Sequence, residues 1–262
     1  LEFEIPQEQG KGLKELAHQT RATLFMVLLG VYNVFLAKVS GQEEIRVGTP
    51  VAGRHHPDLE RVTGMFVNTL VLRNFPHQGK SFVEFLADVQ QETLAAFENQ
   101  DYPYEVLVDA LALDRDTARN PLFDTMFTLQ TPGVSSIHLD YSKIIPYRYE
   151  EKQSKFDIGF TGVEKDTLVF RWDYRTSLFE EETIREFTGY MKKIISAVLA
   201  DPNEKIAEIE IISIEEKQRI LYDFNNTEAD YPKDKFIHEL FAEQAAQNPD
   251  YVALVGPKLQ NT

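Results

Sequence analysis

The 262-residue sequence contains no cysteine, which excludes disulfide bonds, cysteine-ligated zinc and thiol nucleophiles. It is also poor in positive charge: 27 lysines and arginines stand against 42 aspartates and glutamates, a formal net charge of −15. Because a surface that follows phosphates must be basic, this balance argues against binding to nucleic acid or to an anionic membrane. The missing thiols fit a reducing compartment, and we expect a cytoplasmic protein.

Long apolar runs are missing as well. The most apolar segment, residues 24–36, is shorter than the roughly 20 residues that cross a bilayer, and it includes Asn33. We therefore predict a buried core helix there and no membrane partner. The chain begins at Leu1 with neither a methionine nor a signal-like region, so we expect a fragment that is not secreted. Its hydrophobic content of 43% favours a packed core over disorder.

Hydrophobic periodicity predicts helices interleaved with strands. We expect helices at 13–18, 24–41, 81–98, 103–113 and 183–199, and strands at 44–47, 66–73, 122–129, 156–160 and 168–174. Thr23 is a predicted N-cap, Ser81 and Glu84 form a predicted capping box, and Pro103 suits a first helical position. The fold class is therefore α/β or α+β, with helices packed on a mixed β-sheet.

The character of the sequence changes at residue 213. A charged helical pattern at 214–224 is followed by turn-like residues and by an amphipathic pattern at 236–248. We predict a first domain over residues 1–212, an interdomain linker over 213–232, and the truncated start of another domain over 233–262.

Two segments resemble reactive sites without meeting their requirements. Gly48 and Gly53 have the spacing of a phosphate-binding loop, but the lysine that such a loop needs is absent, so we predict a structural loop. His55 and His56 could supply a general base, yet adjacent side chains in a turn diverge, which favours a solvated loop rim. The other histidines are isolated, so no metal site is predicted.

For the other polar residues we expect structural roles, and for Asn68 a functional role is equally open. Asn68 interrupts an apolar strand and is either a positioned hydrogen-bonding group in a channel or a sheet-edge amide bound by neighbouring backbone. Asp101 is expected to cap the helix that follows it. Arg115, Asp116 and Arg119 are expected to form a surface ion-pair cluster of small energetic weight.

Four segments in order carry a more specific signal. They are residues 45–54 (IRVGTPVAGR), 64–73 (GMFVNTLVLR), 99–105 (NQDYPYE) and 115–123 (RDTARNPLF). Together they resemble the later motifs of the condensation domain of nonribosomal peptide synthetases, and the likeness continues through 155–158 and 174–179 to cover residues 1–212. Tyr104 stands where phenylalanine is usual and Ala118 where serine is common. Residues 225–255 resemble the linker and opening helix of an adenylation domain.

The resemblance implies a fold like chloramphenicol acetyltransferase, with two lobes around a tunnel, of which this chain is the C-terminal lobe. It implies peptide-bond formation between aminoacyl or peptidyl thioesters held on phosphopantetheine arms, with no cofactor bound directly. The family's H-H-x-x-x-D-G motif is expected upstream of Leu1, since Glu60 and Arg61 stand where a match at His55 would need Asp and Gly. No catalytic residue is therefore assigned here, and the fragment alone is expected to be inert.

Matching by motif implies two groups of site residues. The tunnel and floor-loop group is Gly48, Thr49, Pro50, Gly53, Arg54 and Asn68. The supporting group is Asp101, Pro103, Glu105, Arg119, Asn120 and Pro121. Residues 130–151 resemble the crossover to the other lobe; without that lobe we expect the fragment to self-associate.

The implied partners are upstream and downstream peptidyl carrier domains, the chain's own N-terminal lobe and a downstream adenylation domain. The competing interpretations are a non-catalytic module that docks carrier proteins, and an epimerisation or heterocyclisation subtype.

Overall fold

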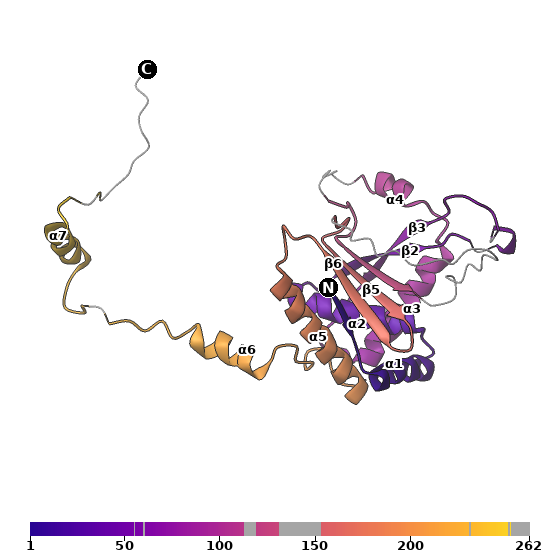
Figure 1. Cartoon of the computed structure of the whole chain (residues 1–262), viewed down its shortest axis with the longest axis horizontal. Helices are drawn as coiled ribbons and strands as arrows, with labels where there is room; N and C mark the ends of the chain where they lie inside the picture. The colour runs from indigo at the N-terminus through magenta and orange to yellow at the C-terminus, as the bar shows by residue number, and fades with distance from the viewer. Residues whose placement is uncertain are drawn as a thin grey trace, which may run out of the picture. The chain divides into compact units, whose positions relative to one another are not determined.

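The computed structural model describes residues 1–54, 56–59, 61–112, 119–130, 153–230, 232–250 and 252. It divides into two compact units, Leu1–Ile212 and Ser213–Thr262. The first unit contains a sheet and the helices that cover it (Figure 1). Of the predicted crossover at 130–151, Gln130 is the last residue of strand β4, and residues 131–151 lie outside the described residues, as do Arg115 and Asp116.

The first unit is built on one mixed sheet, as predicted. Its described strands run in the order β1-β6-β5-β4-β2-β3, with β2, β4 and β5 parallel to one another and the remaining pairs antiparallel. Their bounds are β1 Glu2–Glu4, β2 Ile45–Val51, β3 Asn68–Asn74, β4 Thr125–Gln130, β5 Ile158–Glu164 and β6 Leu168–Tyr174. The short edge strand β1 is not predicted, because three residues carry too little alternation to be recognised.

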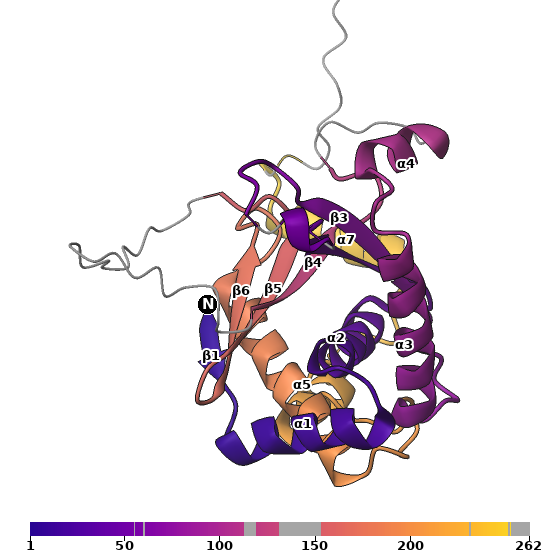
Figure 2. The ribbon, with the colours of Figure 1, turned by 90° about the vertical axis from the view of Figure 1, so that its right-hand side faces the viewer.

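The four long helices lie together on one side of this sheet (Figure 2). They are α1 Gln7–Thr20, α2 Leu24–Ser40, α3 Phe82–Glu98 and α5 Glu181–Ala200. The remaining helical segments of the unit are α4 Tyr104–Ala110 and the short 3-10 turn η1 Pro57–Leu59. The predicted helices are confirmed in place, but α1 is longer than expected and α4 ends before Leu113.

Helix α2 is apolar on all sides because it is buried among its neighbours. Thr23 Oγ1 accepts from the Met26 backbone N–H at 3.2 Å, as predicted, and Gly41 ends the helix in the left-handed conformation. Residues 26–35 are buried, and α2 contacts α1, α3 and α5. Within the described residues no single helix is long and apolar enough to cross a membrane; α1 and α2 meet the length only as a pair bent by 106°.

Alternate side chains of β5 and β6 build the core against these helices. Phe160 stacks with Phe170 at a centroid distance of 5.2 Å and lies 4.3 Å from the Trp172 ring. Trp172 Nε1 donates to Thr188 Oγ1 on α5 at 3.0 Å. The hydroxyl of the fully buried Tyr32 shares a hydrogen bond with Thr125, and burial raises its pKa well above the ordinary value.

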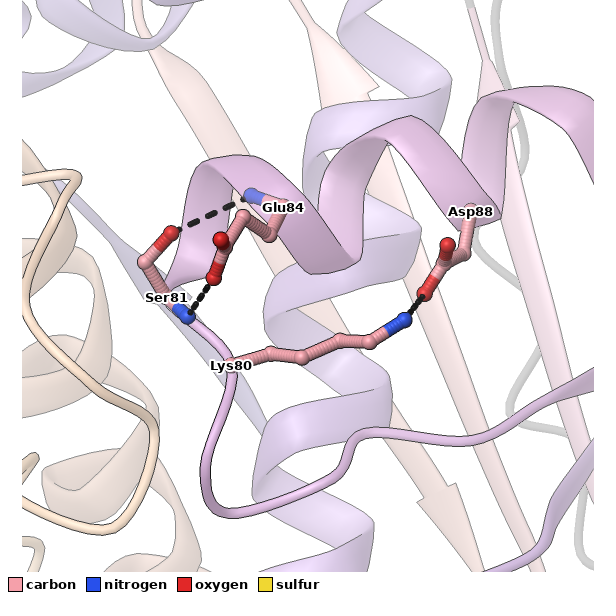
Figure 3. A network of polar contacts seen from close by, with 4 residues as sticks. All are labelled: Lys80, Ser81, Glu84 and Asp88. Atoms are coloured by element: carbon pink, nitrogen blue, oxygen red, sulfur yellow. Dashed lines mark hydrogen bonds and ion pairs between the residues drawn. The ribbon is translucent and has the colours of Figure 1, made fainter.

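The start of α3 is held by the predicted capping box (Figure 3). Ser81 Oγ accepts from the Glu84 backbone N–H at 3.3 Å, and Glu84 Oε2 accepts from the Ser81 N–H at 2.8 Å, a hydrogen bond that lowers the pKa of the Glu84 carboxyl. Lys80 Nζ lies 2.5 Å from Asp88 Oδ2. The Ile206 N–H donates to the Lys80 carbonyl at 2.9 Å, so the last segment of the unit is fastened to this cap.

The second unit has little packing of its own. It contains α6 Ile214–Gln218, the π-helical η2 Arg219–Asp223 and α7 Ile237–Gln247. None of its described residues is buried, and its exposed apolar side chains include Phe236, Ile237 and Phe241. The described part therefore lacks a hydrophobic core.

Candidate functional site

The sheet face opposite the long helices carries small and polar side chains together with Met126. Across β4, β5 and β6 the rows are Met126–Gly159–Asp173 and Thr128–Thr161–Arg171. They alternate with buried rows such as Phe127–Phe160–Trp172, so they point to the other face. A hollow of about 780 Å³ lies along them. We call it the sheet groove; it is also lined by residues 153–156 and 174–177.

Charged pairs border this groove. Asp157, whose side chain is only 13% exposed, lies between two arginines: Arg175 Nη1 is 3.1 Å from one carboxylate oxygen and Arg119 Nη2 is 3.6 Å from the other. Arg171 Nε donates to Asp173 Oδ2 at 3.0 Å. Arg119 is thus paired with a residue distant in sequence, a contact that the predicted local ion-pair cluster does not include.

Gly48, Thr49 and Pro50 lie in strand β2, so the prediction that they form a loop is wrong. The chain is extended there because β3 pairs with β2 along its whole length, while β4 pairs only at Val47 and Gly48. Pro50 is exposed beyond the β4 pairing, where its missing N–H costs no second ladder bond. The glycine and proline that suggest a turn are thus explained by the sheet.

Gly48 makes room for an aromatic ring on the groove side of the sheet. A Cβ placed on it would lie 2.3 Å from Cε2 of Phe123, so no side chain fits. Phe123 belongs to a small cluster with Val108 and Leu122 and does not continue the strand face of Phe127, as the predicted strand 122–129 implied. This cluster links β2 to α4.

Gly53 and Arg54 organise the loop that follows β2. Gly53 has a positive φ of 62°, and a Cβ on it would lie 2.0 Å from the Phe66 carbonyl oxygen. The Arg54 guanidinium donates to the carbonyls of Leu59, Val62 (2.7 Å) and Gly64 (3.3 Å), and it lies 4.3 Å from the centre of the Phe66 ring. The Arg54 guanidinium therefore binds the loop itself.

The side-chain amide of Asn68, at the start of the edge strand β3, is hydrogen-bonded to backbone groups. Its Nδ2 donates to the carbonyls of Gln100 and Tyr102, both at 2.8 Å. Its Oδ1 accepts from the N–H groups of Thr69 at 2.9 Å and Tyr104 at 3.2 Å. These contacts match the sheet-edge interpretation of Asn68, and they also serve the first turn of α4.

Helix α4 begins differently from the prediction. Pro103 is its N-cap rather than its first residue and makes no side-chain capping bond, while the exposed Glu105 lies in the first turn. The expected capping position of Asp101 is thus taken by Pro103, and Asn68 accepts the Tyr104 N–H from across the fold. Local spacing does not reveal a cap supplied from 36 residues away.

Tyr104 connects the start of α4 to Asn120 and Phe123 of the motif segment 115–123. Its hydroxyl donates to Asn120 Oδ1, which also accepts from the Leu122 N–H at 3.2 Å. Burial raises the pKa of the Tyr104 hydroxyl, and its ring packs edge-on against Phe123. Side-chain contacts therefore connect Asn68, Tyr104, Asn120, Phe123 and Gly48, and we call this set the motif clasp.

A second hollow, of about 460 Å³, lies at the starts of β2 and β4. Arg119, Asn120 and Pro121 line it together with Glu44 and other residues. A hydrogen bond from Arg73 at 2.9 Å lowers the pKa of the Glu44 carboxyl. This hollow is smaller than the sheet groove.

The histidines form no site among the described residues. His56 is exposed, with Nδ1 3.6 Å from an oxygen of the exposed Asp58, while His55 and Glu60 lie outside the described residues. In the described part of the chain no three His, Asp or Glu side chains are grouped to hold a metal.

Sequence reasoning did not single out Asp157, Gly159 or Arg175. The resembling segments 155–158 and 174–179 include or adjoin them, and that is the only signal which could have found them. Gly159 and Arg175 line the groove, and Asp157 is paired with Arg175 beside it.

Comparison with known proteins gives consistent matches. The sequence profile described as "Condensation domain" matches residues 1–221. Gramicidin S synthase 2 of Brevibacillus brevis is 47% identical over 255 residues, which is 97% of this chain and 6% of that protein. The chain thus spans a small part of this curated relative.

Two solved structures share the fold. A four-domain nonribosomal peptide synthetase bound to AMP and glycine matches with a TM-score of 0.77 at 22% identity, covering 96% of this chain and 20% of that one. The condensation domain from the monacolin K polyketide synthase MokA matches with a TM-score of 0.70 at 21% identity, covering 79% of this chain and 48% of that one. With the profile match over most of its length, the chain belongs to the condensation domain family.

Proposed function

We propose that this chain supplies the C-terminal lobe of a condensation domain that forms peptide bonds in a nonribosomal peptide synthetase. The observation that carries the proposal is the sheet groove: a large hollow, lined by both polar and apolar residues, on the sheet face opposite the long helices, in a chain whose family profile is that of a condensation domain. Coverage of about half of a solved condensation domain supports the assignment to one lobe.

The proposed reaction joins two carrier-bound groups. The amine of a downstream aminoacyl thioester attacks the carbonyl carbon of an upstream thioester; a C–N bond forms, the C–S bond breaks, and the amine proton ends on the released phosphopantetheine thiol. The role of this lobe is to hold the reactants in line, which can supply a large part of the rate enhancement. The histidine motif that completes the site belongs, in this proposal, to the other lobe.

The motif clasp and the Arg54 loop are proposed to shape the tunnel wall rather than to react. Their polar groups are hydrogen-bonded to protein: Asn68 to four backbone groups and Arg54 to three carbonyls. Such a framework keeps the loops in one arrangement. The role of holding the loops in place then explains why these residues occur in the family's motifs.

We propose the same domain arrangement as above: the lobe over 1–212, a linker over 213–232 and the start of an adenylation domain over 233–262. The match to gramicidin S synthase 2 covers 255 residues and so extends beyond the 221 residues of the condensation profile, which supports a multidomain context. The absence of a core among the described residues of the second unit is compatible with an incomplete domain. Self-association of the separate fragment stays a prediction.

The test is amide formation between two loaded carrier proteins, measured by mass spectrometry. A synthetase that carries this segment is expected to form the amide, and replacement of the second histidine of its H-H-x-x-x-D-G motif is expected to abolish it. The 262-residue chain alone is expected to give no product above background. A synthetase that binds both carriers but forms no amide would instead indicate a docking module, and turnover by the isolated chain would refute the assignment of the chemistry to the other lobe.

A further inference from the structure

Gly159 occupies a strand position where neither packing nor backbone conformation requires glycine. It lies in the middle of β5, between Met126 on β4 and Asp173 on β6. A glycine inside a strand weakens the strand, and it often marks a place where a ligand or another chain approaches closely. The described residues with positive φ do not include it.

Two other strand glycines show what a packing requirement looks like. A Cβ on Gly48 would lie 2.3 Å from the Phe123 ring, and a Cβ on Gly162 would lie 3.0 Å from Leu129 Cδ1 and 3.3 Å from Phe170 Cε1. On Gly159 the nearest described atoms, both of Asp173, would be 3.6 Å away, an ordinary contact. Neither backbone conformation nor described neighbours therefore exclude a side chain at Gly159.

The space left by Gly159 opens into the sheet groove. Met126 and Asp173 are its cross-strand neighbours and share its face, whereas Ile158 and Phe160 on either side of it are buried under the helices. Met126, Gly159 and Asp173 all line the groove. A side chain at this position would narrow the middle of the groove floor.

We propose that Gly159 sets the size of the aminoacyl or peptidyl side chain that the groove accepts. The inference rests on the proposed function, since it gives the groove a carrier-bound acyl group as its occupant. A thioester-linked acyl group with a bulky side chain needs depth beside the reacting carbonyl, and the bare backbone of Gly159 provides it. Ala or Val at this position would favour small side chains.

The test compares small and bulky substrates in a synthetase that carries this segment. The variants Gly159→Ala and Gly159→Val are assayed with glycyl and phenylalanyl groups loaded on the upstream and downstream carriers in all four combinations. We expect the ratio of kcat/KM for phenylalanyl over glycyl, on one carrier side, to fall about fivefold for Gly159→Ala and 20-fold or more for Gly159→Val. The glycyl rate should fall by a smaller factor than the phenylalanyl rate.

Matched controls come from Gly189 on α5, which is exposed and has open space where a Cβ would lie. Gly189→Ala and Gly189→Val should leave the ratio unchanged, and the Tm of the Gly159→Ala variant should equal or exceed that of the wild type. An active wild type whose Gly159 variants keep the ratio, or lose both rates equally, overturns the inference and leaves the proposed function intact. A wild type that forms no amide with any pair contradicts the proposed function and the inference with it.

Discussion

The face of β4, β5 and β6 that the helices cover carries closely packed aromatic rings. The opposite face of these three strands carries Met126 together with glycine, threonine and charged side chains. Phe160 and Gly159 are adjacent in sequence, yet the Phe160 side chain is 1% exposed among aromatic rings, whereas Gly159 lies in the row of Met126 and Asp173 on the other face. Strand geometry alternates side chains between two environments, so stability and recognition can be divided within one strand. Substitutions on the two faces should therefore differ in kind.

The largest effect on stability should come from Phe160→Ala. Phe160 contacts Tyr32, Phe170 and Trp172 in the core, and removing its ring leaves a cavity. We expect a loss of about 3–5 kcal/mol in the free energy of unfolding, measured by denaturant titration. The control is Thr161→Ala on the groove face, for which we expect a much smaller change; equal losses would contradict the division between the faces.

Gly48→Ala tests a place where the groove side of the sheet is tightly packed. The new Cβ would overlap the Phe123 ring, and overpacking of this kind costs about 1–3 kcal/mol. Thermal unfolding should show a lower Tm, with part of it restored by the double variant Gly48→Ala and Phe123→Leu. Gly159→Ala is the matched control and should not lower the Tm. A Gly48→Ala variant with wild-type stability would show that the ring contact does not constrain this strand.

Asn68→Ala should loosen the motif clasp without affecting the core. It removes two donated bonds and leaves the Tyr104 N–H without its acceptor, at a cost of about 1–3 kcal/mol if these groups stay partly buried. Hydrogen exchange should speed up at residues 100–104 and stay unchanged in α2. Asn68→Asp keeps the acceptor for the Tyr104 N–H but places a carboxylate oxygen against the Gln100 and Tyr102 carbonyls, so we expect an effect at least as large as that of Asn68→Ala. Unchanged exchange at 100–104 would remove Asn68 from its proposed positioning role.

The smallest effect is expected from Tyr104→Phe, which removes one hydrogen bond to Asn120, worth about 0.5–1.5 kcal/mol.

Burial raises the pKa of Tyr104 and of Tyr32, so the folded state holds these protons more tightly than the unfolded state does. Their contribution is fully present below the ordinary tyrosine pKa of 10.0 and is lost as pH rises above it. Stability should fall above pH 10, and Tyr32→Phe should flatten that fall in denaturant titrations between pH 8 and 11.

The long periodic elements were open to prediction because their patterns are local. Thr23 and Ser81 mark the starts of α2 and α3 by capping chemistry that spans three residues. The alternation of Leu168, Phe170 and Trp172 marks β6 in the same way. The ordered motifs identified the family, since four of them in sequence are specific even where each one alone is not.

The candidate site was less accessible, because its contacts join residues far apart in the chain. The cap of α4 comes from Asn68, the partner of Arg119 is Asp157, and the ring that explains Gly48 is Phe123. Contacts over such long separations produce no periodic pattern in the sequence. The glycine and proline of β2 are residues typical of a turn, although they lie in a strand. Sequence reasoning therefore placed Gly48 and Pro50 in a loop and Asp101 at a cap.

By itself the sequence determined the mixed α/β class, the long helices, the main strands and the membership of the condensation domain family. Those properties depend on hydrophobic period, capping residues and motif order, which are written in neighbouring positions. Only the tertiary structure decided that Gly159 and Thr161 face an open groove while Phe160 is buried, and that the motif clasp is one connected unit. Strand pairing brings distant residues together, and the free energy of those contacts belongs to the folded arrangement rather than to any local segment.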